Sequence, residues 1–362
     1  MKPLVTSLGW LALVSCAGVG PTPDEVAGAL PPAVELTDAQ RAEVTRLTEQ
    51  AMAELEAEDF EAADISARAA REIDPRAALA IAVQARCAMA WALRSEPPEL
   101  GPWQRAEGLL RLARRIAPTD AVIGRMHVSY LEADGHLSAA SAVADELLAQ
   151  DPDNYEVLAD AARLQYELGD EEDALPLLER IIELDPGADQ MRYRLAQCRL
   201  RLARTLAGSS ATKDEKLAAF KEVARVFEVY RERVPGDAAG YAGEATARFA
   251  GVRLKGEPDE GELDTILGLF ERARDLDPLS PEPEFNRGVV LESAERADEA
   301  QAAYRVALER DPEHLPSLLN LAASLADSGR EEDAVPLCER ALRLNVTPGE
   351  KSRLEAFLAA RR

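Results

Sequence analysis

A period of 34 residues limits the folds that this chain of 362 residues can adopt. Proline recurs at Pro118, Pro152 and Pro186, and glycine recurs with the same spacing at Gly135 and Gly169. A fixed period in this range is typical of repeat architectures, in which each repeat is one supersecondary unit. The stretch 122–186 therefore holds two copies of one unit, and it sets the register for the rest of the sequence.

Each unit predicts a pair of amphipathic helices. Between Tyr155 and Pro186, apolar residues recur at helical spacing on both sides of Gly169. The second run stops at Pro186, because the residue before a proline avoids the helical conformation. One such pair cannot bury its apolar face alone, so neighbouring pairs must stack against each other. The expected fold class is all-α, with aromatic residues making up only 5% of the chain.

The unit resembles the tetratricopeptide repeat (TPR), which has small or apolar residues at fixed positions and a proline near its end. With Tyr155 as position 1, the matching residues are Leu158, Ala161, Ala162, Ala174, Leu178, Ile181 and Pro186. The resemblance implies a TPR-like α-solenoid: a right-handed superhelix of about eight antiparallel helix pairs plus a C-terminal capping helix. The repeats would occupy residues 37–348 and the capping segment residues 349–362, with the last helix at 350–360 after a break at Pro348-Gly349.

Three of the repeats are longer than the others, and their extra residues fall between the first and second helices. We expect loops at 95–101 in repeat two, at 207–216 in repeat five and at 255–261 in repeat six. The first helix of repeat six contains Gly240, Gly243 and Gly251, each of which costs up to about 1 kcal/mol relative to alanine. Of all the predicted helices, this one has the composition least favourable to helix formation.

The amino terminus resembles a bacterial lipoprotein signal peptide over residues 1–15. Lys2 precedes the apolar run 3–14, which is too short to cross a bilayer as a helix. The letters LVSC, ending at Cys16, are similar to a lipobox, and this resemblance implies cleavage before Cys16 and lipidation of that residue. Residues 16–36, rich in proline and glycine, would form a flexible tether. The alternative is an ordinary secretory signal with an incidental cysteine.

The same resemblance predicts where the protein resides. It would be lipid-anchored in a bacterial cell envelope, because two or more buried acyl chains hold a protein stably on a membrane. Ala17, instead of an aspartate, follows Cys16, and by analogy with enteric lipoproteins this favours the periplasmic face of the outer membrane.

Composition and motifs argue against several classes of function. The net charge of −24 argues against nucleic-acid binding, because phosphate backbones require clustered lysine and arginine. No nucleophile elbow, phosphate-binding loop or zinc-protease motif occurs, so we predict no enzyme activity and no cofactor. The histidines and the remaining cysteines do not show the spacing of metal ligands: His127, His136, His314, Cys87, Cys198 and Cys338. We expect the histidines to be core or turn residues. The three cysteines lie in different repeats, so we expect them to be buried and to form no disulfides.

The resemblance also implies a binding groove along the first helices of the repeats. Groove positions in repeats three to five include Gln197, Leu200 and a locally basic, aromatic strip, which we call the arginine–tyrosine strip: Arg125, Arg163, Tyr166, Tyr193 and Arg201. Arginine binds carboxylates through two parallel hydrogen bonds, and tyrosine offers rigid contact area. We expect an extended or helical peptide, including one with an acidic group, to bind there. The alternative is that these side chains are ordinary solvated positions.

These observations favour a membrane-anchored scaffold that mediates protein–protein interaction in the assembly or organisation of a cell-envelope complex. The alternative is a lipoprotein of the secretin- or pilus-assembly type, which only the architecture supports. A glycan-binding protein or an enzyme ranks third, since either requires convergent polar groups that the sequence does not display.

Overall fold

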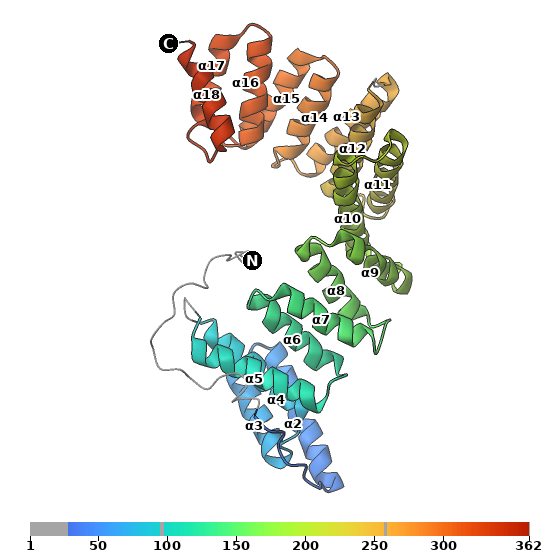
Figure 1. The fold of residues 1–362 in the computed structure, drawn as a ribbon, viewed down its shortest axis with the longest axis vertical. Helices are drawn as coiled ribbons and strands as arrows, with labels where there is room; N and C mark the ends of the chain where they lie inside the picture. The colour runs from blue at the N-terminus through green and yellow to red at the C-terminus, as the bar shows by residue number, and fades with distance from the viewer. Residues whose placement is uncertain (1–27, 95–97, 257–258, 362) are drawn as a thin grey trace. The chain divides into compact units, whose positions relative to one another are not determined.

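The computed structural model describes residues 28–94, 98–256 and 259–361, which form helices and connecting turns without any strand (Figure 1). The predicted all-α, TPR-like solenoid is confirmed. The described residues form 17 helices, which is the number expected from eight pairs and a final single helix. The chain divides into two compact units at Asp170 and Glu171.

Unit 1 contains the first seven described helices. Their bounds are α2 Asp38–Glu56, α3 Phe60–Ile73, α4 Ala78–Ala92, α5 Leu100–Ile116, α6 Ala121–Ala133, α7 Leu137–Leu148 and α8 Tyr155–Leu168. Each helix from α2 to α7 packs on the next one along the chain, and α4 also contacts α2 and α6. The first helices of adjacent repeats therefore lie against each other.

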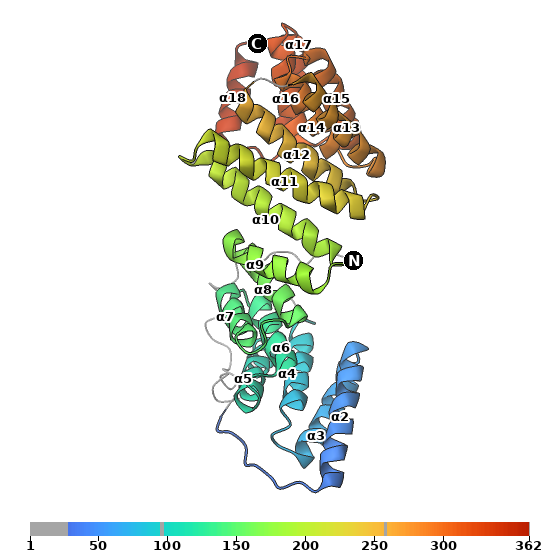
Figure 2. The same cartoon turned by 90° about the vertical axis from the view of Figure 1, so that its right-hand side faces the viewer.

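Unit 2 contains the remaining ten. Their bounds are α9 Glu171–Leu184, α10 Asp189–Gly208, α11 Lys213–Arg233, α12 Ala238–Lys255, α13 Glu260–Leu276, α14 Glu282–Ser293, α15 Ala297–Arg310, α16 Leu315–Asp327, α17 Glu331–Ala341 and α18 Pro348–Ala359. Figure 2 shows α10, α11 and α12 side by side. Here too α12 contacts both α10 and α14, so the first helices again form one face.

Alanines at helical spacing hold the second helices close to their neighbours. In α3, Ala63, Ala67 and Ala70 are fully buried. Residues three and four apart share one face of a helix, so these methyl groups form a smooth stripe on which the adjacent helix packs. The cysteines Cys87, Cys198 and Cys338 occupy similar buried positions and are free thiols, as predicted.

Glycines in α12 allow two aromatic rings to pack against its backbone. A Cβ atom at Gly243 would lie 2.3 Å from the Cε1 atom of Phe227, and one at Gly240 would lie 2.9 Å from the Cδ1 atom of Tyr230. No heavy atom lies within 4 Å of the Cβ position at Gly251. Tertiary packing therefore explains two of the three glycines that disfavour this helix, which forms over 18 residues.

Several predicted boundaries are wrong, since α5 begins at Leu100 and α13 at Glu260, inside predicted loops. The polar insert 207–216 is mostly helical: α10 continues to Gly208, and α11 begins at Lys213 behind a capping box between Thr212 and Glu215. The last helix begins at Pro348, because Thr347 and Glu350 form another capping box. Proline fits the first helical position, where its missing N–H would have no partner anyway.

Two carboxylates are buried in unit 2, and arginines from two helices hold each of them. Glu244 on α12 is 1% exposed and pairs with Arg231 on α11 and, at 2.7 Å, with Arg248. Glu284 on α14 lies 3.3 Å from Arg274 on α13. Removing one partner would leave a charge buried and unpaired, so these pairs constrain how successive repeats align.

Two arginines of unit 1 contact part of the segment predicted as a flexible tether. Arg115 donates a hydrogen bond of 2.8 Å to the carbonyl oxygen of Gly28, and Arg76 donates one of 2.7 Å to that of Pro31. The predicted signal peptide, Cys16 and the rest of the tether lie outside the described residues. Within the described part of the chain, no helix combines the length and the apolar character needed to cross a membrane.

His127 is buried in unit 1, as predicted for a core position, and is 8% exposed. Its Nδ1 atom has no hydrogen-bond partner among the described residues. Burial, followed by the nearby guanidinium groups of Arg114 and Arg111, lowers the pKa of His127 to about 4, although the Glu146 carboxylate opposes this shift. The folded protein therefore holds a neutral imidazole at this position.

Replacing Gly243 with alanine should destabilise the protein by up to about 2 kcal/mol. The steric cost of the new methyl group, about 1–3 kcal/mol, exceeds the gain in helix propensity of about 1 kcal/mol. Gly251→Ala is the matched control in the same helix and should stabilise the protein by up to about 1 kcal/mol. Urea unfolding followed by circular dichroism measures both changes. Equal shifts for the two variants would contradict the packing described for Phe227.

Protonation of His127 should make folding less favourable in acid. Between about pH 6.5 and pH 4 the unfolded chain binds a proton at this residue and the folded chain does not, so the free energy of unfolding falls as the pH falls. A His127→Leu variant lacks this contribution. Its stability relative to the natural chain should therefore rise by roughly 2–3 kcal/mol from pH 7 to pH 4. Parallel stability curves in urea titrations would show that the histidine is accessible to protons.

Candidate ligand-binding pocket

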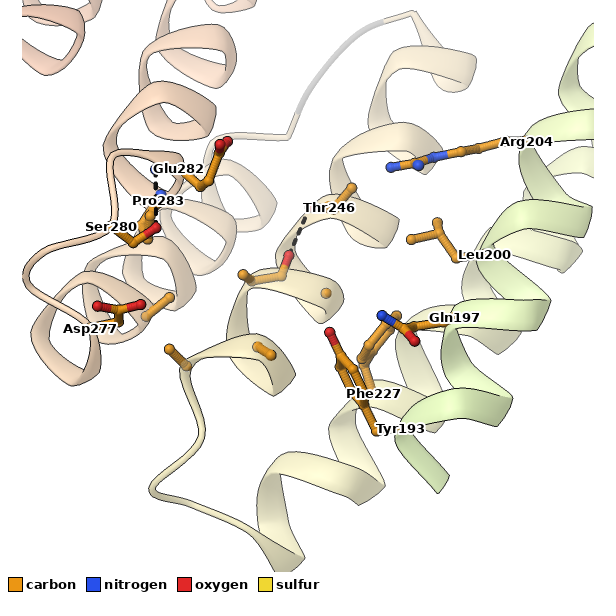
Figure 3. A pocket seen from close by; sticks show the side chains of 15 residues that line it. Tyr193, Gln197, Leu200, Arg204, Phe227, Thr246, Asp277, Ser280, Glu282 and Pro283 are labelled. Carbon is orange, nitrogen blue, oxygen red and sulfur yellow. Dashed lines mark hydrogen bonds between the residues drawn. The ribbon is translucent and has the colours of Figure 1, made fainter. Parts of the chain in front are cut away.

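Unit 2 contains a pocket of about 320 Å³ on the face formed by its first helices (Figure 3). Its walls come from α10, α12 and the start of α14, and α11 and α13 contribute side chains behind them. The lining residues are Tyr193, Gln197, Leu200, Arg204, Phe227, Ala238, Ala239, Ala242, Gly243, Thr246, Ala273, Asp277, Ser280, Glu282 and Pro283.

One wall of the pocket is a single face of α10. The four residues that line it are spaced by three or four positions, which places their side chains in a row along the helix: Tyr193, Gln197, Leu200 and Arg204. Figure 3 shows these side chains extending from α10 toward the helices opposite. Arg204 is within reach of the pocket because α10 is 20 residues long and continues past the length of an ordinary first helix in this chain.

Small side chains on α12 leave the space open. The α12 residues at the pocket are alanines, Gly243 and Thr246, whose hydroxyl donates to the carbonyl oxygen of Ala242 at 2.7 Å. The threonine hydroxyl is therefore satisfied within its own helix. Larger side chains at these positions would fill the space between α10 and α14.

Aromatic rings fix the position of Tyr193 at the base of the pocket. The Tyr193 ring centroid lies 5.2 Å from that of Tyr230 and 6.1 Å from that of Phe227. Such tilted and edge-on pairs are favourable beyond the area that they bury. The hydroxyl of Tyr230 donates to Asp237, and burial together with this carboxylate raises the pKa of Tyr230 above its ordinary range. Tyr193 is therefore a rigid part of the wall.

The two sides of the pocket carry opposite charges. Arg204 is exposed on α10, whereas Asp277 and Glu282 lie on the α13–α14 side (Figure 3). Glu282 also contacts the buried ring of His314, with 3.3 Å between Oε1 and Nε2. The space between them is apolar, because alanines and Phe227 line it. The site can therefore accept an apolar group with a negative charge at one end and a positive charge at the other.

In unit 1, carboxylates from neighbouring repeats pair with the arginines of the predicted arginine–tyrosine strip. Arg125 contacts Asp160 at 2.6 Å and Glu156 at 3.0 Å. Arg163 pairs with Glu132 and contacts Asp160 at 3.2 Å. Burial lowers the pKa of Arg163, but the hydrogen bonds to Glu132 and Asp160 outweigh burial and raise it overall.

This arrangement changes the electrostatic prediction for the strip. Asp160 bridges the two arginines, so the structure does bring Arg125 and Arg163 together. Four carboxylates surround them, since Glu167 also lies 3.7 Å from Arg163. The expected basic surface is therefore not basic at this point. A glutamate at position 163 would face these acids, so Arg163→Glu should destabilise the packing of these repeats.

The other strip residues divide between the two units. Tyr166 lies on α8 in unit 1, and Tyr193 and Arg201 lie on α10 in unit 2. Arg201 contacts Glu171 at 2.6 Å and does not line the pocket, whereas Tyr193 does. Of the groove positions expected on α10, Gln197 and Leu200 also line the pocket. As a binding surface, the strip remains a prediction.

Sequence reasoning missed the residues that complete the pocket, chiefly Arg204, Asp277 and Glu282. Arg204 lies one helical turn beyond Leu200, so the helical spacing of Tyr193, Gln197 and Leu200 could have revealed it. Asp277 and Glu282 belong to a turn between repeats, and nothing in the sequence places that turn opposite α10. Among the described residues, no group of three His, Cys, Asp or Glu side chains could hold a metal ion.

Family models place this fold among known proteins. The tetratricopeptide repeat model matches residues 131–183, and a second tetratricopeptide repeat model matches residues 259–314 and 285–345. The chain therefore contains tetratricopeptide repeats in these ranges. The matched ranges fall mainly in repeats three, four, seven and eight, which follow the 34-residue period without insertions.

Solved structures with similar folds include other repeat proteins. MamA from Desulfovibrio magneticus RS-1 is 17% identical, with 54% of this chain and 96% of that chain covered and a TM-score of 0.44. A thermophilic TPR protein of Thermus thermophilus is 23% identical, with 55% and 95% covered and a TM-score of 0.40. YrrB, described as a TPR protein with an unusual peptide-binding site, is 17% identical, with 59% and 97% covered and a TM-score of 0.41. No curated protein sequence matches this chain.

Proposed function

We propose that this protein is a non-catalytic scaffold that binds another protein through the pocket on the first-helix face of unit 2. The pocket itself supports this proposal most directly: it combines an apolar base, a rigid tyrosine and opposite charges at its two ends. A peptide segment with one apolar side chain between an acidic and a basic residue would match all three features. Repeat proteins of this fold typically present such faces to other proteins.

The charges of the pocket favour selectivity over affinity. Arg204 and Glu282 are exposed, and exposed ion pairs contribute about 0–1 kcal/mol each. The apolar base and Tyr193 would provide most of the binding energy, because aromatic and apolar anchors dominate protein interfaces. The charges of the pocket would determine the orientation of the bound segment. A reversed segment would place its basic residue next to Arg204 and its acidic residue next to Glu282.

We also propose that the protein is lipid-anchored at Cys16 in a bacterial cell envelope, where it helps to assemble or organise a membrane-associated complex. The signal-like residues 1–15 and the LVSC sequence support this proposal. An anchor confines the scaffold to the membrane surface, which raises its effective concentration toward any partner held there. A partner in the outer membrane is the expected case.

A photo-crosslinking amino acid at position 197 should capture the partner in intact cells. Gln197 lies in the wall of the pocket, so crosslinks should form with one main protein that mass spectrometry identifies. Arg204→Glu should reduce this crosslink at least tenfold, because it places like charges on both sides of the pocket. Arg353→Glu, an exposed arginine on α18, is the matched control and should leave the crosslink unchanged. Equal loss in both variants would contradict a specific role for the pocket.

Cys16→Ser should move the protein from the membrane fraction to the soluble fraction. Lipidation requires the cysteine sulfur, and each buried methylene of the acyl chains contributes about 0.8 kcal/mol to membrane binding. Detergent phase partitioning of cell extracts measures the change. Cys87→Ser, which removes a buried thiol elsewhere, should leave the distribution unchanged. Retention of the Cys16 variant at the membrane would rule out the lipid anchor.

A further inference from the structure

A second groove lies on the other side of the helix pairs in unit 2, between the second helices of repeats seven and eight. It has a volume of about 530 Å³, and α15 and α17 form its sides. Leucines form its floor: Leu308 and Leu337 are 8% and 9% exposed, and Leu321 and Leu325 on α16 lie deeper. We call this the leucine groove. None of its residues lines the pocket next to α10.

Three arginines surround the leucine groove in a chain whose net charge is −24. Asp333 pairs with Arg330 at 2.6 Å, so this pair is neutral. Arg340 donates to the carbonyl oxygen of Pro312, which leaves its positive charge without a balancing carboxylate. Among the residues that the structure describes, Arg305 forms no ion pair. With Glu309 as the remaining acid, the rim carries a net positive charge.

The repeat scaffold does not require all of these residues, as a near copy within the same chain shows. Repeats seven and eight match repeats three and four with an offset of 160 residues, which aligns Pro312 with Pro152 and Pro336 with Pro176. At this offset Asp145 replaces Arg305, Asp170 replaces Arg330 and Gln165 replaces Leu325. The helices form in both places, so Arg305, Arg330 and Leu325 are not needed for folding. Arg340 and Leu337 have the identical counterparts Arg180 and Leu177.

We infer that the leucine groove is a second binding site, which accepts an acidic segment of a partner protein with an apolar side chain between carboxylates. The apolar side chain would lie on the leucine floor, and the carboxylates would bind Arg305 and Arg340, which offer planar sets of N–H donors. Distant acids of the chain oppose such a ligand only weakly, because salt screens charges beyond about 8–10 Å at physiological ionic strength. The scaffold thereby holds two partners, or two segments of one partner, on opposite faces of unit 2.

Fluorescence anisotropy with a labelled synthetic peptide tests this site on the full chain. The probe has leucines between aspartates and glutamates, and the reference peptide has lysines in place of the acids. The acidic probe should bind and the lysine peptide should not. The double variant Arg305→Glu, Arg340→Glu should weaken binding of the acidic probe at least tenfold, whereas Glu309→Arg should tighten it, because it removes the opposing carboxylate.

Two controls separate this site from general charge effects and from the pocket next to α10. Lys351→Glu with Arg353→Glu causes the same change in net charge on α18 and should leave the dissociation constant within twofold. Arg204→Glu should also leave it unchanged, so the leucine groove can succeed or fail independently of the proposed function. Circular dichroism confirms that each variant is folded.

Four outcomes would overturn the proposal. In the first, the acidic probe fails to bind at millimolar concentration, and in the second, both double variants lose the same affinity for it. In the third, the Glu309→Arg variant binds the probe more weakly. In the fourth, phosphatidylglycerol vesicles bind through Arg305 and Arg340 and the probe does not bind. The last outcome would identify a membrane surface as the occupant.

Discussion

Close contact between successive helix pairs is the interaction on which this structure depends. A single pair has no way to bury its apolar stripe, so each repeat is stable only against its neighbours. Alanine stripes such as Ala63, Ala67 and Ala70 bring the helices close together. At Gly243 the contact with Phe227 is closer still, and even the methyl group of an alanine would not fit. The glycine lowers the helix propensity of α12 at this position.

The same constraint creates the two candidate binding sites. Small residues on α12 let α11 pack tightly behind it, and they also leave room in front of it between α10 and α14. The helix α10, which is 20 residues long, then brings Arg204 to that space. On the other side, α15 and α17 leave the leucine groove between them. The candidate binding surfaces thus result from how helices of different length and side-chain size stack.

Fold and local structure could be predicted to different degrees. The 34-residue period predicted helix pairs correctly, because it reflects a contact that every repeat must make. The polar composition of the insert in repeat five predicts a loop, whereas the capping box of Thr212 and Glu215 begins α11 within it. Pro348 was misread as a break because proline is also compatible with a first helical turn. Both errors arose at helix ends, where a few side-chain hydrogen bonds decide the boundary.

The sequence by itself determined the fold class, the number of repeats and the buried, unbridged state of Cys87, Cys198 and Cys338, because these follow from periodicity and spacing along one chain. Only the tertiary structure decided the charge of the candidate surfaces. Arg125 and Arg163 find their carboxylates 35 and 31 residues away, on neighbouring repeats, so the sequence displayed the arginines but not their neutralising partners. In a stacked repeat protein each surface is built by adjacent repeats, and its chemistry therefore depends on contacts that no single repeat contains.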